Sequence, residues 1–177
     1  TDEAVRRASV DVLVKLQPEV LMSHATAVVQ RLEEESWGSR EAAIEVLLKG
    51  FEPAALAPYA SRIAKGLDDE EWYMRKVTAE VLGRLEPAAL ALQAPALALR
   101  LMDSDDDVRK AALGALANLD AAELALHASQ IARLRDEDTE WYIQKSAEEV
   151  LVKLGNYETK ELCDTAPSAA DDACGEP

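Results

Sequence analysis

The chain has 177 residues, and its 34 Asp or Glu residues against 19 Lys or Arg residues give a formal net charge of −15. This acidity argues against a nucleic-acid-binding protein, because phosphate contacts need a basic surface. Glycine and proline number only 7 each and aromatic residues make up 5% of the chain, which predicts an all-α protein that forms one domain or a short repeat array.

Charged residues interrupt every apolar window of helix length, so the sequence predicts a soluble protein without a transmembrane segment of its own. The chain begins Thr1-Asp2-Glu3, without a basic or apolar leader. A cytoplasmic location and an organellar location after removal of a targeting segment both remain open. The chain could equally be a piece of a longer repeat array.

Three sets of residues recur at intervals of about 34 residues, a period typical of helical repeats. They are Arg6, Arg40, Arg75, Arg109 and Gln144; then Pro18, Pro53, Pro87 and Ala121; then Trp37, Trp72, Asp106 and Trp141. Because the three sets advance together, they predict a half repeat at 2–16 followed by hairpins at 18–50, 53–85, 87–119 and 121–154, with about nine helices in all.

Each predicted hairpin has a first helix that begins at the proline position, where the missing N–H costs nothing. A short acidic turn follows, and then a second helix. In the hairpin at 53–85 the second helix runs from about Trp72 to Leu85 with an apolar stripe that includes Met74, Val77 and Val81. Acidic residues before this helix suit the positive end of its dipole.

These residues resemble the HEAT-repeat family, in which an Asp in the turn precedes an Arg of the second helix by six residues. The corresponding pairs are Glu34 with Arg40, Asp69 with Arg75, and Asp103 with Arg109. The resemblance covers about residues 2–154 and implies a right-handed α-solenoid in which these acids and arginines tie neighbouring repeats together. Asp138 is followed by Gln144 instead of Arg, a departure that puts the last tie in doubt.

Both ends of the array depart from the repeat. Val5, Val12 and Leu13 lie on a helix without a first helix of its own, so a cap or a partner is expected to cover them. Residues 155–177 are predicted to form an acidic tail, with Gly155 and the Asn that follows as the helix stop. Cys163 and Cys174 lie in this segment, either as free thiols or as a disulfide.

The sequence predicts no catalytic residue, cofactor or metal site, and therefore no enzyme activity. His24 and His127 lie in first helices three repeats apart and are expected to be solvated surface residues. The acidic run from Asp103 to Asp107 is superficially similar to a calcium loop, but position 114, where a bidentate Glu would be needed, is Gly. The repeated acidic turn explains the run without a metal.

Two surfaces are candidates for binding a protein partner. Aromatic residues at the start of the second helices form one edge, where they either pack against the next repeat or recognise a basic or amphipathic segment. Outward positions of the second helices form the other, on the concave side that the family uses, where they are either a solvated face or a groove for a helix or peptide. The candidate residues are Arg7, Glu41, Glu45, Lys76, Glu80, Arg84, Lys110, Lys145, Glu149, Trp37, Trp72, Tyr73, Trp141 and Tyr142.

The sequence thus predicts a non-catalytic scaffold or accessory subunit that binds a protein partner within a larger assembly, and it leaves docking onto a membrane complex open. Two alternatives remain. One is a HEAT-like lyase or chaperone-type enzyme that handles a prosthetic group, and the other is a fragment of a longer repeat array. Neither the partner nor the compartment follows from the sequence.

Overall fold

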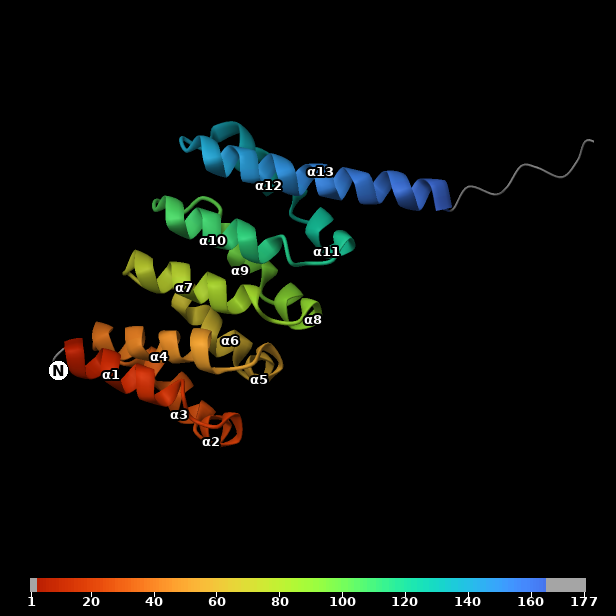
Figure 1. Ribbon diagram of the computed structural model, residues 1–177. Helices are drawn as coiled ribbons and strands as arrows, with labels where there is room; N and C mark the ends of the chain where they lie inside the picture. The colour runs from red at the N-terminus through yellow and green to blue at the C-terminus, as the bar shows by residue number, and fades with distance from the viewer. Residues whose placement is uncertain (1–2, 165–177) are drawn as a thin grey trace, which may run out of the picture.

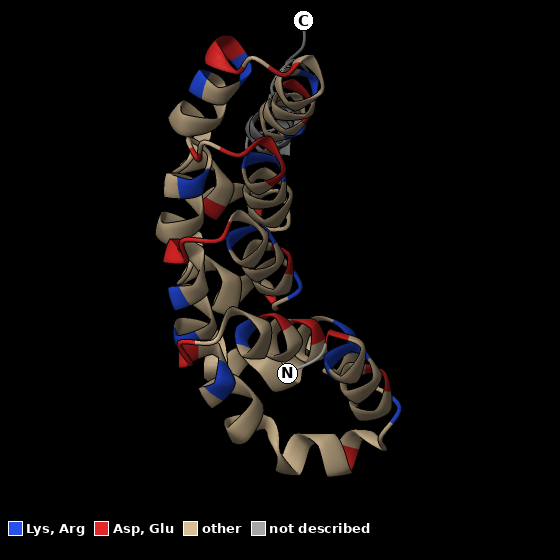
Figure 2. Cartoon of the chain, turned by 90° about the vertical axis from the view of Figure 1, so that its left-hand side faces the viewer, with Lys and Arg blue, Asp and Glu red and all other residues tan. Residues whose placement is uncertain are grey.

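The computed structural model describes residues 3–164, with side chains as far as Gly155. This part of the chain is a solenoid of stacked helical hairpins (Figure 1), which confirms the predicted fold class. The second helices form one layer and the first helices the other. Figure 2 shows that the stack bends at its N-terminal end, with the second helices on the inner side of the bend.

The inner layer consists of single continuous helices that lie side by side. In chain order they are α1 (Glu3–Leu13), α4 (Trp37–Gly50), α7 (Trp72–Gly83), α10 (Asp106–Leu116) and α13 (Trp141–Asp164). Their N-termini lie along one edge of the molecule, next to the acidic turns, which are red in Figure 2. The side chains that begin these helices therefore gather on that edge.

The outer layer differs from the sequence-based expectation, because every first helix is broken into shorter pieces. The pieces are α2 (Pro18–Ser23), α3 (Ala25–Gln30) and η1 (Arg31–Glu33); α5 (Pro53–Leu56), η2 (Ala57–Tyr59), α6 (Ala60–Ile63) and η3 (Ala64–Asp68); α8 (Pro87–Ala91) and α9 (Ala94–Arg100); α11 (Ala121–Ala125) and α12 (Ala128–Glu137). The break falls at the same repeat position in each hairpin.

The breaks lie at His24, Tyr59, Gln93 and His127, whose φ angles fall between −102° and −109° with ψ near zero. This backbone conformation ends one helix and starts the next. At Gln93, for example, the N–H donates to the Leu90 carbonyl (2.8 Å), and the Gln93 carbonyl accepts from the N–H of Leu97 (3.1 Å). Both leucines are fully buried, so the core continues through the break.

One hydrophobic cluster extends through the repeats from Val10 to Val150. Residues such as Leu47, Leu82 and Leu116 of successive inner helices are completely buried. Each repeat covers the apolar side of its neighbour, as expected for a solenoid. At the N-terminal end Val5 and Val12 are exposed.

The helix stop predicted at Gly155 is wrong, because α13 continues through that residue to Asp164. A single glycine within a helix costs only about 1 kcal/mol relative to alanine. The residues that follow include good helix formers such as Glu158, Lys160 and Leu162, which favour continuation. The question of a disulfide between Cys163 and Cys174 lies outside the side chains that the structure describes, as does the rest of the predicted tail.

None of the helices in the described part of the chain is both long enough and apolar enough to cross a lipid bilayer.

Candidate functional site

A row of arginines joins successive repeats along the turn edge. Arg75 shows the pattern: its Nε and Nη2 both donate to the carboxylate of Asp103 in the next hairpin, at 2.8 Å. Its Nη1 donates to the backbone carbonyls of Asp69 (2.9 Å) and Glu70 (3.0 Å) in its own turn. The same arrangement joins Arg40 to Asp69 and Arg109 to Asp138.

Each turn acid of the HEAT-like pattern therefore has two roles. Its backbone carbonyl accepts a hydrogen bond from the arginine of its own hairpin, and its carboxylate accepts from the arginine of the preceding hairpin. Glu34 is an exception, since its carboxylate pairs with Arg31 while its carbonyl accepts from Arg40. Gln144 keeps only the carbonyl contact, and its amide donates to the Asp138 carbonyl at 2.6 Å.

These contacts affect the pKa values of the turn acids. Burial alone would raise the pKa of Asp103, whose side chain is 4% exposed. The hydrogen bonds from Arg75 and from the N–H of Asp105 outweigh burial, so the pKa of Asp103 lies below its usual value. The pKa of Asp138 is lowered in the same way by Arg109. Both carboxylates are thus held in the charged form.

A second row of contacts lies at the opposite edge, where the inner helices end. Arg84 donates to the backbone carbonyls of Leu47, Leu48 and Phe51 at the C-terminal end of α4, with the Phe51 contact at 2.8 Å. Cations and amide donors at a helix C-terminus satisfy carbonyls that have no partner within the helix. Arg84, predicted to bind a partner, is therefore already used to join α4 to α7.

Two tyrosines fill the inner face between neighbouring helices. The Tyr73 hydroxyl donates to the Glu45 carboxylate at 3.0 Å, and the Tyr142 hydroxyl donates to the carboxylate of Asp106. Burial, followed by the bond to Glu45, raises the pKa of Tyr73 to about 12. The bond to Asp106 raises the pKa of Tyr142, also to about 12. Both hydroxyls remain protonated donors at neutral pH.

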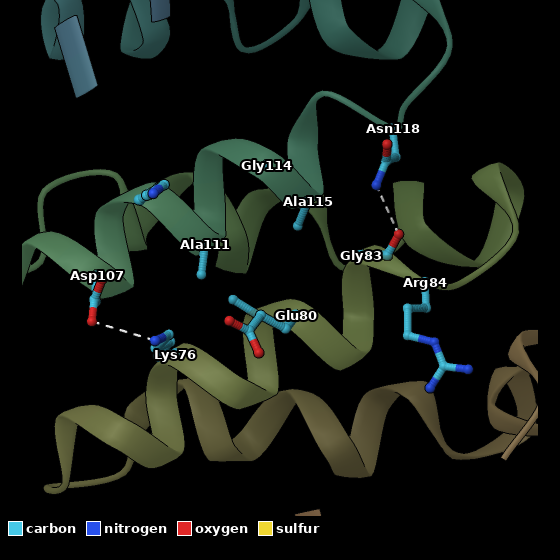
Figure 3. Close-up of a pocket in the computed structure, with 11 residues that line it drawn as sticks. Lys76, Glu80, Gly83, Arg84, Asp107, Ala111, Gly114, Ala115 and Asn118 are labelled. Atoms are coloured by element: carbon cyan, nitrogen blue, oxygen red, sulfur yellow. Dashed lines mark hydrogen bonds and ion pairs between the residues drawn. The ribbon is translucent and has the colours of Figure 1, made fainter. Parts of the chain in front are cut away.

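Between α7 and α10 the inner face is open, and it forms a groove of about 400 Å³ (Figure 3). We call this the α7/α10 groove. Small side chains form much of its floor, and charged side chains line its rim. The residues that line it are Lys76, Ala79, Glu80, Gly83, Arg84, Asp107, Lys110, Ala111, Gly114, Ala115 and Asn118.

The α7/α10 groove is located where one hairpin departs from its siblings. The position of Tyr73 and Tyr142, which is Gly38 in the first hairpin, is occupied by Asp107, and the position of Glu45, Glu80 and Glu149 is occupied by Gly114. No atom lies within 4 Å of the point where a Cβ of Gly114 would be. Two large side chains are thus replaced by smaller ones, which leaves the space open.

The charges around the groove are only partly paired. Lys76 Nζ lies 3.3 Å from the Asp107 carboxylate and 6.0 Å from the ring centre of Trp72. Lys110 Nζ lies 5.4 Å from the ring centre of Tyr142, a distance suited to a cation–π contact. Figure 3 shows Glu80 on α7, on the side that faces α10. The groove therefore offers both positive and negative groups to a ligand.

At the far end of the groove, Asn118 Nδ2 donates to the Gly83 carbonyl at 3.0 Å (Figure 3). Asn118 occupies the same repeat position as Arg84 and joins α10 to α7 in the same way. The sequence pattern predicts that this position is one of the outward positions of the second helices. Only the stacked structure shows that it contacts the end of the preceding helix.

The remaining inner-face candidates lie on separate helices and pair mainly within them. Arg7 pairs with Glu3 at 2.6 Å, Lys49 with Glu45 at 3.0 Å, and Lys145 with Glu149 at 4.0 Å, all one helical turn apart. Burial, followed by the charge of Glu45, raises the pKa of Glu41.

The apolar residues that directly precede the outward positions of the second helices do not form an open strip. Val10, Ile44 and Leu113 are buried in the core, whereas Val152 is exposed. The three buried residues are therefore not accessible to a ligand of the inner face.

The aromatic edge is exposed to solvent. Trp37, Trp72 and Trp141 begin α4, α7 and α13 and are 41%, 43% and 71% exposed. The rings of Trp72 and Tyr73 meet edge to face, with centres 5.9 Å apart, and Trp141 and Tyr142 pack in the same way. Each tyrosine turns toward the neighbouring repeat while its tryptophan stays accessible.

The histidines occupy the breaks of two first helices. His24 is exposed, as expected, but His127 is buried, so the expectation of a solvated surface residue is wrong there. His127 shares its repeat position with Gln93, which is equally buried, and its Nδ1 has no hydrogen-bond partner. The shared position gives it a packing role at the break.

The acids of the calcium-like run each contact protein groups. Asp103 pairs with Arg75, Asp105 accepts from the Val108 N–H at 3.2 Å, and Asp107 pairs with Lys76. The run therefore serves as a turn and a helix cap.

Comparison with known proteins supports the fold. No protein-family model and no curated protein sequence matches the chain. Its structure is similar to a chain in the complex of CpcE and CpcF of phycocyanin lyase from Nostoc sp. PCC7120, with a TM-score of 0.57 and 17% sequence identity. The similarity covers 85% of this chain and 99% of that chain. At this identity it shows a shared helical solenoid fold.

This similarity corrects the prediction that the protein is not an enzyme. That prediction rested on the lack of a recognisable cluster of catalytic side chains in the sequence. Because a chain with the same fold belongs to a lyase complex, the lack of such a cluster is not a sound reason to exclude enzymes. The similar chain was also solved in a complex of two proteins.

Proposed function

We propose that this chain is a subunit of a lyase-type assembly and that it binds its protein partner through the α7/α10 groove. The similarity to a chain of the two-protein phycocyanin lyase complex supports the type of assembly. The groove itself is the observation that carries the binding role, because it lies where Asp107 and Gly114 stand at the positions that Tyr73 and Glu80 occupy in the preceding hairpin.

The chemistry of the groove favours a helix or an extended peptide as its occupant. Ala79, Ala111 and Gly114 let a backbone approach the floor closely. Lys76 and Lys110 on the rim can pair with acids of the partner, and Glu80 with a base. The exposed tryptophans and acidic turns of the adjacent edge extend this surface toward a basic or amphipathic segment. The net charge of −15 would steer such a partner toward the protein.

The substitution Gly114→Glu tests this proposal, because it installs the sibling residue and fills the groove. The Cβ has room and the helix loses a glycine, so the fold should be retained. We expect partner capture from the native source to fall about tenfold, which corresponds to about 1.4 kcal/mol. Crosslinks from Lys76 and Lys110 to the partner should disappear at the same time.

Gly155→Glu is the matched control, since a Cβ at Gly155 also meets nothing within 4 Å and the residue lies in an inner helix outside the groove. This variant should retain the partner. Equal capture by wild type and Gly114→Glu, or equal loss in both variants, would contradict a binding role of the groove.

The lyase character of the assembly needs its own assay. The captured complex should catalyse attachment of a chromophore to an acceptor protein, measured as covalent absorbance on the acceptor after denaturation. The complex captured with Gly155→Glu should do so equally well. A complex that binds its partner but attaches no chromophore would retain the binding role and refute the lyase type.

A further inference from the structure

The outer face of the third hairpin carries exposed apolar side chains in a regular pattern. Leu92, Leu99 and Met102 are 79%, 69% and 48% exposed, and Ala88 and Pro95 are also exposed. Ala88 lies in α8, Pro95 and Leu99 lie in α9, and Leu92 and Met102 follow the ends of these two helices. Their spacing alternates between four and three positions, which places neighbouring members on one side of each helical piece. We call these five residues the α9 stripe.

The fourth hairpin repeats the first two positions of this stripe with Ala122 and the exposed Leu126, but no sibling hairpin carries the Leu99–Met102 pair. Counted from the helix breaks, the position of Leu99 is occupied by Gln30, Lys65 and Arg133 in the other hairpins. The position of Met102 is occupied by Glu33, Asp68 and Asp136. The repeat therefore folds with charged residues at both positions. Exposed leucine and methionine there contribute little to the fold and are typical of an interaction surface.

Charges of opposite sign flank the two ends of the Leu99–Met102 pair. Lys65 and Arg133 occupy the position of Leu99 on the two neighbouring outer helices, and Asp68 and Asp136 occupy that of Met102. The Arg100 guanidinium lies 3.1 Å from the Asp68 carboxylate, which places Asp68 directly beside the end of α9. All four flanking side chains are more than half exposed.

We propose that the α9 stripe is an interface between two copies of this chain, related by a two-fold axis that passes the C-terminal end of α9 between Leu99 and Met102. With the two α9 helices antiparallel, Leu99 of one copy faces Met102 of the other. Lys65 then faces Asp68 of the second copy, and Arg133 faces Asp136. A parallel arrangement would instead bring Lys65 against Arg133, so the charges select the antiparallel one.

The flanking charges are available for this pairing. Lys65 pairs with Glu33 at 2.9 Å and Arg133 with Glu137 at 2.7 Å within one copy. Exposed pairs of this kind contribute under about 1 kcal/mol and can exchange partners. The stripe is narrow, so the interface is smaller than that of an obligate dimer, and we expect a dissociation constant in the micromolar range.

Sedimentation equilibrium of the full chain tests the proposal. The wild type should change from dimer to monomer on dilution. Leu99→Lys and Met102→Asp, which install the residues of the second hairpin, should each raise the dissociation constant at least about tenfold. Val152→Lys is the control, because it also replaces an exposed apolar residue by lysine, but on an inner helix. It should leave the dissociation constant unchanged. Thermal melts of all variants confirm that they fold.

A charge swap tests the antiparallel arrangement. Lys65→Asp should weaken the dimer, and the double variant Lys65→Asp with Asp68→Lys should restore it, because the two residues face each other across the axis. In a parallel dimer Lys65→Asp would strengthen association, which would overturn the arrangement. A wild type that is monomeric at about 100 μM, or a dimer unaffected by Leu99→Lys, would overturn the proposal. So would a monomer that uses the stripe to bind another protein.

Discussion

Arg75 makes four hydrogen bonds, two to a carboxylate of the next hairpin and two to carbonyls of its own turn. One side chain thus fixes a turn and its neighbour at the same time. The planar guanidinium suits this role because its donors point in fixed directions. Gln144, in the last hairpin of the described chain, makes the contact with its own turn through an uncharged amide.

We expect Arg75→Gln to lower the free energy of unfolding by about 2–4 kcal/mol, because the nearly buried Asp103 carboxylate loses its bidentate partner and keeps only the longer contact with Arg100 (3.7 Å) and the Asp105 N–H. Urea denaturation measures this loss. Adding Asp103→Asn to the variant removes the poorly compensated charge and should recover part of the stability. A double variant no more stable than Arg75→Gln would show that the carboxylate is not the source of the cost.

The regular recurrence of arginine and proline in the sequence was sufficient to predict the hairpins, because those residues have fixed places at helix starts and turns. Two residue roles were not predictable in this way. Arg84 and Asn118 contact the end of the preceding helix, so their role depends on how the repeats stack. Sequence spacing alone placed them on an outward face.

At the scale of the helices, the breaks in the outer layer were missed. The residues at the breaks, His24, Tyr59, Gln93 and His127, share no chemical type, and none is a typical helix breaker. The signal lies in the next residue, which is alanine in all four hairpins. Three of these alanines, Ala25, Ala60 and Ala94, are buried, so a small side chain is selected where the new piece begins.

The contact between α7 and α10 also depends on small residues. A Cβ at Gly83 would lie 3.0 Å from the Ala115 Cα, closer than ordinary packing allows, whereas a Cβ at Gly114 would meet nothing within 4 Å. Both glycines lie at ordinary negative φ angles. Gly83 therefore serves the close approach of the helices, and Gly114 keeps the groove open.

These two glycines give a paired prediction. Gly114→Ala should raise the free energy of unfolding by about 0.5–1 kcal/mol through helix propensity. Gly83→Ala should be at least about 1 kcal/mol less stable than Gly114→Ala, because α10 must move away. Thermal or urea unfolding compares the two. Equal stability would mean that α7 and α10 can separate at no cost.

At the scale of the whole molecule, the arginine row makes stability depend on pH. The pKa values of Asp103 and Asp138 are lower in the folded protein than in an unfolded chain. A lowered folded pKa contributes stability that is present above the unfolded value of about 3.9 and is lost as the pH falls through the folded value.

We therefore expect the free energy of unfolding to fall most steeply below about pH 4, which urea titrations at a series of pH values would measure. The variant with Arg75→Gln and Asp103→Asn lacks one of these pairs and should show a shallower fall. An identical pH profile for this variant and the wild type would mean that the turn acids do not control acid unfolding.

The solenoid could be predicted from the sequence because the same pattern of residues recurs in successive hairpins, and each recurrence independently indicates a helical hairpin. The α7/α10 groove was harder to predict, because it arises from exceptions to the repeat at Asp107 and Gly114. The α9 stripe arises in the same hairpin, again from exceptions. A comparison of each hairpin with its siblings, position by position, would have indicated both surfaces before the structure.

The two rows of contacts at opposite edges of the inner layer have a mechanical consequence. Contacts at both edges of the inner layer join α7 and α10: Arg75 with Asp103 at one edge, and Asn118 with the Gly83 carbonyl at the other. Two helices joined at both ends are expected to resist both rotation and separation relative to each other. We therefore expect the α7/α10 groove to keep its width, so that a ligand that fits it can bind without a prior opening of the two helices.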